Sequence, residues 1–410
     1  MKILHTSDWH IGRALYGRKR YQEFERFLDW LIACIETEGV EALLVAGDVF
    51  DNGTPSNRAQ ELYYRFLCRC AGAGCRHVVV TAGNHDSPSL LNAPREVLRY
   101  LDIHVVGCMA ESADDELVVL YDSNGKAELI VCAVPYLRDR DIRRAEAGET
   151  FEDKGRKLVE GIRDHYQRVG EAALAKRAEL GGGLPIIAMG HLFTSGGRTI
   201  ADDGVRELYV GTLGHVRADI FPDCFDYLAL GHLHVAQRVS GSDARRYSGA
   251  PLPMSFGEAG QRKLVLVLNV DCRGVDVQEI SVPFFQPLAT VRGDWSQITE
   301  RIAELKRDAV SIWLEVIYEG EEILADLQER LRELIDGTSL EILRSKNLRL
   351  VDRTLSRLAA EETLDDLTFD DVFARCLAAH EVPAEQQGEL VAVFREAVLA
   401  LQDDDLRGPR

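Results

Sequence analysis

The stretch VVVTAGNHDS, from Val78 to Ser87, passes from buried to chemically reactive residues within a few positions. Its three valines are typical of a buried strand, and we expect Gly83 to let the chain turn sharply before Asn84 and His85. Two interpretations are open for these ten residues. Either a strand ends here in an ordinary turn, or the strand delivers polar side chains to an active site.

Similar short apolar runs recur through roughly the first 280 residues. Six of them predict buried strands: KILHTSD (2–8), ALLVAGD (42–48), HVVVTAGNH (77–85), LIVCAVP (129–135), LPIIAMGH (184–191) and YLALGHLH (227–234). Between the first two strands, apolar residues from Tyr21 to Ile35 recur at three- and four-residue intervals, which predicts an amphipathic helix. The same spacing predicts a second helix from Leu62 to Cys70. This alternation indicates a layered α/β domain over residues 1–282.

The pattern changes after residue 282. Ile298, Ile302 and Leu305 predict a helix, VSIWLEVIY (310–318) a strand, and the leucines from Leu324 to Leu334 a second helix. Residues 283–345 are therefore expected to form a small α+β unit. The polar, basic RSKNLRLVDRTLSR (344–357) predicts a linker, and residues 346–410 are expected to comprise this linker and two terminal helices.

The charge of the chain is unevenly distributed. A net charge of −19 argues against a protein that coats nucleic acid by bulk electrostatics. However, residues 361–405 contain thirteen acidic and two basic residues, so much of the negative charge lies in one terminal segment. Basic residues cluster elsewhere, at Arg13, Arg18, Lys19 and Arg20, and at Arg138, Arg140, Arg143 and Arg144.

Composition also limits the expected location of the chain. No run of about 18 apolar residues is present to span a membrane, and the N-terminus lacks the apolar stretch of a signal peptide. We therefore expect a cytoplasmic protein. The nine cysteines include no C-x-x-C pair, which favours reduced, mostly buried thiols over a zinc knuckle or redox centre.

Polar residues lie at the carboxyl ends of five of the six predicted strands, at equivalent positions. They are Asp8, His10, Asp48, Asn84, His85, His191, His232 and His234. The carboxyl ends of strands in an α/β sheet line the crevice in which ligands bind. Two carboxylates, four of the five histidines at metal-type spacings and an amide oxygen are more ligands than one ion takes, so the set predicts two metals that share a carboxylate. Nitrogen and oxygen ligands without thiolate favour manganese, with iron or zinc as alternatives.

The motifs DWH, GDVFD, GNHD, GHLF and GHLH, in this order, resemble the five signature motifs of calcineurin-like metallophosphoesterases. Within that superfamily the chain is similar to the SbcD family, the nuclease subunits of bacterial SbcCD complexes. HTSDWHIGR, FDYLALGHLH and YSGAPLPMSFGE extend the resemblance beyond the five motifs. It covers most of the chain and is weakest from about residue 360 onward.

The resemblance implies a role for each of these residues. One metal would be held by Asp8, His10, Asp48 and His234, and the second by Asp48 as a bridge together with Asn84, His191 and His232. His85 would lie on the substrate side, as proton donor or stabiliser of phosphoryl charge, and Asp51 would orient it. Asp86 is expected to be a turn or capping residue.

The resemblance also implies the architecture and the activity. The fold would be a β-sandwich flanked by helices, with residues 283–345 as a capping domain and the C-terminal helices as the docking element for an SbcC-type ATPase. The activity would be double-strand exonuclease and single-strand or hairpin endonuclease cleavage of DNA in repair, recombination and replication. A homodimer would form within a heterotetramer. The chain has no Walker A motif, so any ATP dependence would come from the partner.

Two other functions remain open at this point. The same metal scaffold could serve a phosphomonoesterase or a cyclic-nucleotide phosphodiesterase, although a small substrate needs neither a cap nor an acidic helical end. A structural subunit could bridge DNA ends without using the metal site. The basic segment GRALYGRKR (12–20) favours a nuclease, because we expect it to leave the metal site as a loop and to meet phosphates. The acids within RDRDIRR (138–144) could instead pair inside that segment.

Overall fold

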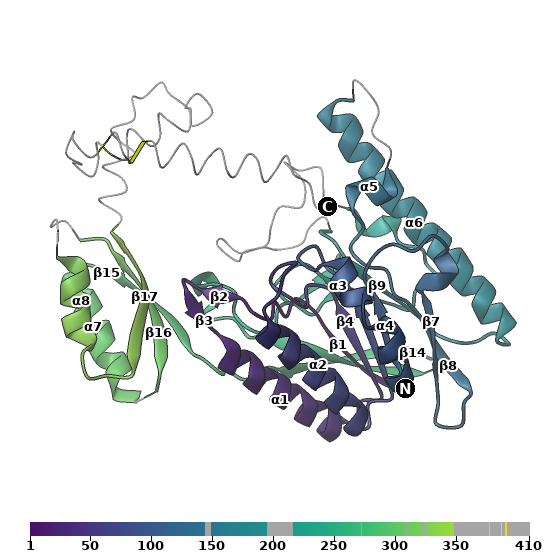
Figure 1. Cartoon of the computed structure of the whole chain (residues 1–410), viewed down its shortest axis with the longest axis horizontal. Coiled ribbons are helices and arrows are strands. Elements are labelled where there is room, and N and C mark those ends of the chain that lie inside the picture. Colours follow the sequence, from purple (N-terminus) through teal and green to yellow (C-terminus); the bar gives the residue numbers. More distant parts are fainter. Residues whose placement is uncertain are drawn as a thin grey trace. The chain divides into compact units, whose positions relative to one another are not determined.

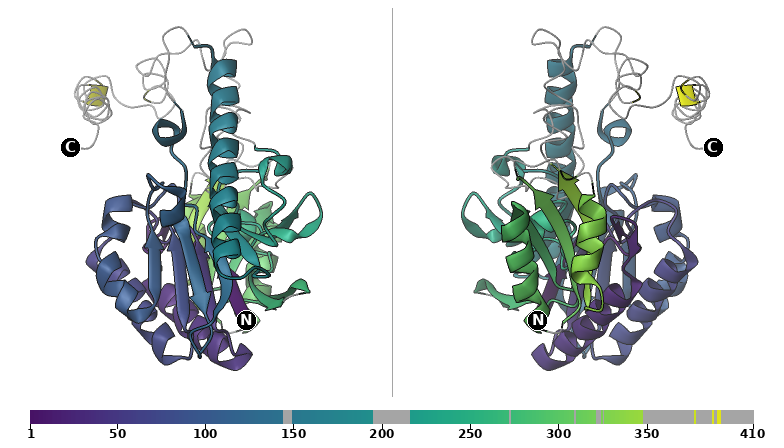
Figure 2. Two further views of the ribbon diagram at one scale, coloured as in Figure 1. Left: turned by 90° about the vertical axis from the view of Figure 1, so that its right-hand side faces the viewer. Right: turned by 90° about the vertical axis from the view of Figure 1, so that its left-hand side faces the viewer.

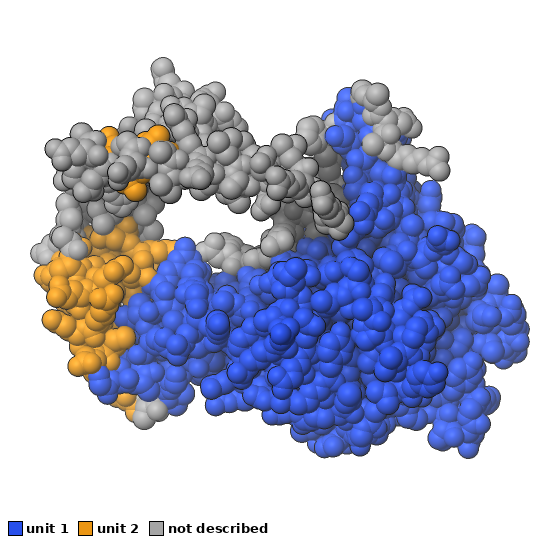
Figure 3. Space-filling view, viewed as in Figure 1, with its two compact units in different colours: residues 1–290, 308–315, 337–344 blue, residues 291–307, 316–336, 345–410 orange. Residues whose placement is uncertain are grey.

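The computed structural model describes residues 1–143, 149–194, 216–271, 273–308, 310–320, 324, 326–347, 377, 387, 390 and 391. The chain divides into two compact units (Figure 3). Unit 1 comprises Met1–Thr290, Asp308–Glu315 and Gly337–Arg344, and unit 2 comprises the rest. Within the described ranges, no helix is both long enough and apolar enough to cross a membrane.

The first sheet contains the strand formed by the three valines of VVVTAGNHDS. Its order is β14 (Gly274–Ser281), β13 (Leu264–Asp271), β1 (Lys2–Thr6), β4 (Ala42–Ala46), β5 (His77–Thr81) and β6 (Ile103–Val106). The strands β1, β4, β5 and β6 are parallel, and β13 joins β1 in the antiparallel direction. Since the parallel strands all point the same way, the loops that follow them lie at one edge of the sheet.

Helices α1 (Tyr21–Glu38) and α2 (Asn57–Gly72) cover one face of this sheet (Figure 1). Successive side chains of a strand point to opposite faces. Val78 and Val80 therefore pack in the cluster that includes these helices, whereas Val79 packs in the cluster on the other face. The three valines are buried because both faces of β5 are covered.

The second sheet has the order β11 (Gln237–Val239), β12 (Ser242–Tyr247), β10 (Tyr227–Gly231), β9 (Ile186–His191), β8 (Ala127–Cys132) and β7 (Leu117–Tyr121). Its outer face packs against α6 (Phe151–Glu179), a single long helix (Figure 2). The helix begins with a capping box between Thr150 and Asp153. The apolar spacing in the sequence did not predict this helix.

The inner faces of the two sheets form a shared apolar core. Leu44 and Val79 of the first sheet belong to the same cluster as Val131, Met189 and Ala229 of the second. The layers are thus helix, sheet, sheet and helix. The predicted α/β sandwich flanked by helices is confirmed.

Shorter elements complete the chain. They are the hairpin of β2 (Ala14–Leu15) and β3 (Arg18–Lys19), and the helices α3 (Pro88–Asn92), α4 (Arg95–Leu98) and α5 (Asp139–Ile142). A third sheet has the order β15 (Leu288–Gly293), β16 (Ile312–Tyr318) and β17 (Leu340–Asn347), and it is accompanied by α7 (Trp295–Leu305) and α8 (Leu327–Ile335).

Two predicted features of the C-terminal part differ in outcome. The prediction that a linker begins at Arg344 is wrong for its first four residues, because residues 344–347 belong to strand β17. The two predicted terminal helices lie outside the described residues, apart from Leu377, Gln387, Leu390 and Val391, which are helical.

Candidate metal centre

The predicted ligand residues meet at the carboxyl ends of strands from both sheets. Asp8 and His10 follow β1, Asp48 follows β4, and Asn84 follows β5. His191 ends β9, and His232 and His234 follow β10. All of them are buried except Asn84, which is half-buried. The two sheets of the sandwich therefore bring together residues separated by up to 226 positions, as Asp8 and His234 are.

The backbone at these positions is strained. Asp8, His10, Asp48 and His232 have φ of 54°, 48°, 51° and 103°. Residues other than glycine adopt such values only at a cost, and they cluster at functional sites. The packing of the surrounding sandwich is what holds these four residues in place.

Two motif glycines are required because other atoms come too close for a side chain. A Cβ on Gly83 would lie 2.1 Å from Asp48 Oδ1, and a Cβ on Gly231 would lie 1.9 Å from the main-chain oxygen of Ala46. Gly83 does not have a positive φ. The expected bend follows directly at residues 84–86, and Gly83 is required because Asp48 approaches the end of β5 closely.

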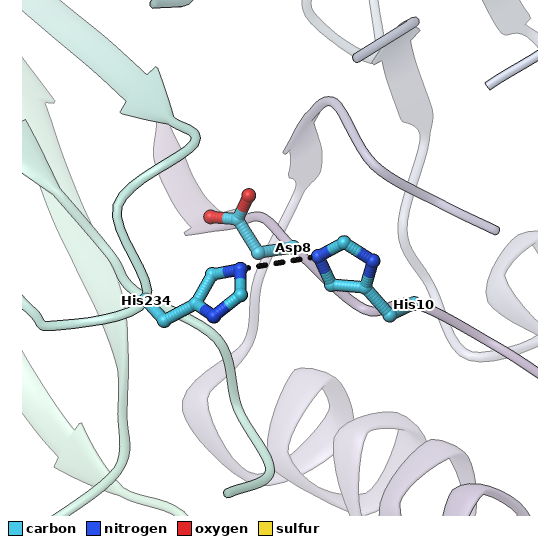
Figure 4. A group of neighbouring side chains, drawn as sticks. All are labelled: Asp8, His10 and His234. Carbon is cyan, nitrogen blue, oxygen red and sulfur yellow. Dashed lines mark hydrogen bonds between the residues drawn. The ribbon is translucent and has the colours of Figure 1, made fainter. Parts of the chain in front are cut away.

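One group of ligand atoms is formed by Asp8, His10 and His234 (Figure 4). The Nε2 atoms of His10 and His234 face each other at 3.2 Å. Two nitrogens bound to one metal at about 2.0–2.1 Å lie roughly 3 Å apart. The spacing of these two rings therefore fits ligation of a common ion.

A second group is formed by Asp48, His191 and His232, with Asn84 beside them. His191 Nε2 lies 3.2 Å from Asp48 Oδ2 and 3.0 Å from Asn84 Oδ1, and His232 Nδ1 lies 3.3 Å from the same amide oxygen. Asp48 Oδ2 is also 3.7 Å from His10 Nε2. Asp48 thus lies between the two groups, where a bridging ligand has to be.

The second group needs a cation at its centre. His191 Nδ1 donates to the carbonyl oxygen of Ala46 at 3.0 Å, so in the neutral ring Nε2 presents a lone pair to the oxygens of Asp48 and Asn84. The lone pair of Nε2 and those of the two oxygens repel each other. A proton or a metal ion between these atoms removes the repulsion. Consistent with that, burial alone would lower the pKa of His191, but the Asp48 carboxylate raises it to about 9.

Burial and neighbouring charges also shift the pKa values of Asp48, His10 and His232. Burial alone would raise the pKa of Asp48, but the neighbouring His191 holds it far below its ordinary value. Burial lowers the pKa of His10, and burial together with His191 lowers that of His232. These two histidines are therefore neutral at pH 7, which is the form that binds metal. The residues present fit two metal ions that share Asp48.

Several supporting residues were missed in the sequence. Ser7 Oγ donates to Asp8 Oδ2 at 2.6 Å and lies 2.8 Å from Ser248 Oγ. Glu258 lies 3.8 Å from His234 Nδ1 and raises the pKa of that histidine against the effect of burial. Lys263 in turn pairs with Glu258. Partners of this kind orient metal ligands.

The ring of His85 lies beside His10 and Asp51. Its Nδ1 donates to the main-chain oxygen of Asp51 at 2.7 Å, while its backbone N–H donates to Asp48 Oδ1 at 2.8 Å. The carboxylate of Asp51 lies 3.3 Å from Arg13 and 3.6 Å from His10 Nδ1. Asp51 therefore contacts His85 as expected from the sequence, but through its carbonyl group instead of its carboxylate. His10, Asp51 and His85 also lie close enough together to be metal ligands.

Asp86 ties two of the loops together. Its buried carboxylate accepts hydrogen bonds from the backbone N–H groups of Val49 at 3.1 Å, Phe50 at 2.9 Å and Gly83 at 2.8 Å. Burial and the Asp48 carboxylate raise the pKa of Asp86 to about 7. The expected capping role agrees with these contacts, which join the loop after β4 to the loop after β5.

The basic residues predicted to meet phosphates differ in whether their side chains are exposed and whether they already pair with an acid. Residues 12–20 contain the β2–β3 hairpin instead of a loop. Arg20 is buried in an ion pair with Glu23 and is not available to a ligand. Arg143 pairs with Asp139 and Glu149, as the alternating acids indicated. Arg140 is exposed and lies 3.6 Å from Asp141 of the same segment, and Arg144 lies outside the described residues.

Comparison with known proteins agrees with this geometry. Residues 1–236 match the family model of calcineurin-like phosphoesterases, and residues 284–381 match the model called type 5 capsule protein repressor C-terminal domain. The SbcD subunit of nuclease SbcCD from Escherichia coli (strain K12) is 38% identical over 398 residues, which cover 96% of this chain and 97% of that relative.

Two further relatives are SbcD subunits of the same nuclease from other bacteria. The one from Rhodobacter capsulatus is 38% identical over 276 residues, and the one from Bacillus subtilis is 34% identical over 271 residues. Each of these alignments covers 66% of both chains. The resemblance inferred from the motifs is confirmed, and the chain belongs to the SbcD family of calcineurin-like phosphoesterases.

Proposed function

We propose that the chain is the manganese-dependent nuclease subunit of an SbcCD-type complex, acting as an exonuclease on double-stranded DNA ends and as an endonuclease on single-stranded or hairpin DNA. The observation that carries the proposal is the convergence of two groups of ligand atoms on Asp48. Family membership supports the phosphodiester bond of a nucleic acid as the bond that is hydrolysed, since the relatives are named as nucleases.

In the proposed assignment, each metal has three ligands of its own and shares Asp48. Asp8, His10 and His234 complete one set, and Asn84, His191 and His232 complete the other. Two bound metals supply a nucleophilic water and neutralise charge on the phosphoryl group during in-line attack. Manganese suits these nitrogen and oxygen ligands.

We assign His85 to the substrate side of the centre. Its Nδ1–H is held by the carbonyl oxygen of Asp51, so Nε2 is the ring atom that can exchange a proton with a leaving oxygen. The backbone N–H of the same residue holds Asp48 Oδ1. His85 would thus position a metal ligand through its main chain and meet the substrate through its side chain.

The proposed partners are DNA and an SbcC-type ATPase, with two copies of each protein in a cytoplasmic heterotetramer. Residues 283–345 would form the cap over DNA, and the acidic segment 361–410 would dock on the ATPase, because its apolar stripes suit a protein groove while its charge repels DNA. Deleting residues 361–410 should abolish co-purification with the partner. Undiminished co-purification would place the docking surface elsewhere.

The activity is tested with the full-length chain and its SbcC-type partner. We expect manganese-dependent cleavage of linear duplex and hairpin DNA, and loss of cleavage in Asp48→Asn purified in parallel. The alternative is a phosphomonoesterase or cyclic-nucleotide phosphodiesterase. Robust hydrolysis of small phosphate esters without cleavage of DNA would favour that alternative and overturn the proposal.

A further inference from the structure

Unit 1 contains a cavity of about 410 Å³ that is separate from the metal ligands. Its walls come from the β2–β3 hairpin, the first turns of α1 and α2, and residues 285–286, 311, 313 and 341. Five basic and two acidic side chains line it: Arg18, Lys19, Arg20, Arg26 and Arg58, with Glu23 and Glu341. A net positive cavity is unexpected in a chain whose net charge is −19.

The acidic residues of the cavity are already paired. Glu23 accepts two hydrogen bonds from the buried Arg20, and Glu341 lies 3.3 Å from Arg18. The remaining cations, Lys19, Arg26 and Arg58, are exposed, and none forms an ion pair with an acid in the described part of the chain. Three positive charges are therefore available to a ligand.

The backbone adds further positive potential to this cavity. The helices α1 and α2 both begin at its wall, where the hydroxyl of Tyr21 lies 2.7 Å from that of Ser56, the N-cap residue of α2. The N-terminus of a long helix carries a partial positive charge that acts over its first turn. Two such termini beside exposed arginine and lysine side chains favour an anion with several oxygen atoms, such as a phosphate group.

The cavity also lies near the metal centre along the chain. Lys19 pairs with Ala14, which is four residues after His10. Four extended residues span at most about 14 Å, and the paired strand adds about 5 Å. The Cα atoms of Lys19 and His10 are therefore at most about 19 Å apart, a length that about six nucleotides of one DNA strand cover along the axis.

We propose that this cavity binds a backbone phosphate of the same nucleic acid that the metal centre cleaves. The proposal rests on the proposed nuclease function and adds a second point of contact. Phosphate contacts fix the position of DNA without reading its sequence. The cavity would therefore set the direction in which the strand leaves the metal centre.

The test compares two double variants of the full-length chain. Arg26→Gln/Arg58→Gln removes two cations of the cavity. Arg65→Gln/Arg69→Gln removes two exposed arginines of α2 that pair with Glu25 and Asp29 outside the cavity. Binding of a fluorescent duplex oligonucleotide is measured by anisotropy in EDTA, so that cleavage does not interfere, over a series of salt concentrations.

We expect the cavity variant to bind duplex DNA about tenfold more weakly, and the slope of log K against log salt to fall by about 2. The control variant should keep the wild-type slope. An equal slope in both variants would overturn the proposal. Binding of inorganic tripolyphosphate to both variants is measured by calorimetry. Loss of tripolyphosphate binding in the cavity variant together with unchanged DNA binding would also overturn the proposal, because the cavity would then hold a free anion.

The binding measurement in EDTA tests the cavity independently of the cleavage assay that tests the nuclease function. Hydrolysis of a small phosphodiester by the wild-type chain reports on the metal centre alone. If the chain hydrolyses small esters and cleaves no DNA, the proposed function fails. The salt dependence of binding still decides whether the cavity holds a backbone phosphate.

Discussion

His191 shows at the level of a single residue why the centre needs a cation. Its Nε2 faces Asp48 Oδ2 at 3.2 Å and Asn84 Oδ1 at 3.0 Å, and its other nitrogen is occupied by the carbonyl of Ala46. In the absence of metal, a proton takes the central position, and the pKa of His191 rises to about 9. Proton and metal therefore compete for one site.

This competition predicts the pH dependence of metal binding. Below pH 9 the proton on His191 must leave before Nε2 can bind a metal, so affinity should rise with pH and level off near 9. One released proton gives about a tenfold rise in affinity per pH unit. Calorimetry with manganese between pH 7 and 9 measures this slope, and a flat profile would contradict the account.

The same group affects the stability of the metal-free chain in the opposite direction. Because its folded pKa of about 9 lies above the unfolded value, the stability that protonated His191 contributes is complete below about pH 6.5. It is lost as the pH rises through 9. Metal-free protein should therefore become less stable over the range in which it binds metal more tightly.

His85→Ala should abolish DNA cleavage while both metals remain bound. Its side chain is a proposed proton donor, and such groups contribute about 10²–10⁴-fold to rate. Its backbone N–H, which holds Asp48 Oδ1, is kept in the variant. Cleavage rate and elemental analysis are measured together, with His104→Ala on β6 as control. Loss of half the metal would show that the imidazole of His85 is itself a ligand.

The sequence predicted the ligand candidates because they occur in short motifs after recognisable strands. Ser7, Ser248, Glu258 and Lys263 carry no comparable signal. Ser248 reaches Asp8 only through Ser7, from 240 positions away. Glu258 lies in the segment after β12, and the fold of this segment brings its carboxylate to 3.8 Å from His234. A single sequence does not show such distant supporting contacts.

At the scale of secondary-structure elements, Asp86 connects the ends of β4 and β5. Asp86→Asn replaces one acceptor oxygen with an NH₂ group and leaves backbone N–H groups without a partner. We expect a loss of about 2–3 kcal/mol in the free energy of unfolding and weaker metal binding, because Asp48 and Asn84 lie on these two loops. Urea denaturation measures the loss. The exposed Asp115→Asn should change neither quantity.

The elements could be predicted only where hydrophobic spacing is clear. The strands β1, β4, β5, β8, β9 and β10 are mostly buried apolar runs, and α1 and α2 carry regular apolar stripes, so these elements were recognised. The parallel strands β6 and β12 have fewer buried apolar residues and were not recognised. The outer helix α6 has a largely polar surface, and the antiparallel β14 alternates between exposed and half-buried residues. Both are fixed by packing against sheets that are assembled from distant parts of the chain.

At the scale of the whole molecule, the centre depends on how closely the two sheets approach. Gly231 of β10 faces the main-chain oxygen of Ala46 of β4, and an added Cβ would lie 1.9 Å from it. Gly231→Ala should push the sheets apart, cost about 1–3 kcal/mol and lower the metal content. Gly260→Ala is the matched control, because nothing lies within 4 Å of its added Cβ. Equal stability and metal content in the two variants would refute this dependence.

The central claim is that one molecule holds two metals that share Asp48. Anomalous scattering from crystals soaked with manganese tests it most directly. We predict two ions about 3.5–4 Å apart, with Asp48 bound to both, and with the three remaining ligands of each set as assigned. A single ion, or two ions of which only one contacts Asp48, would contradict the account.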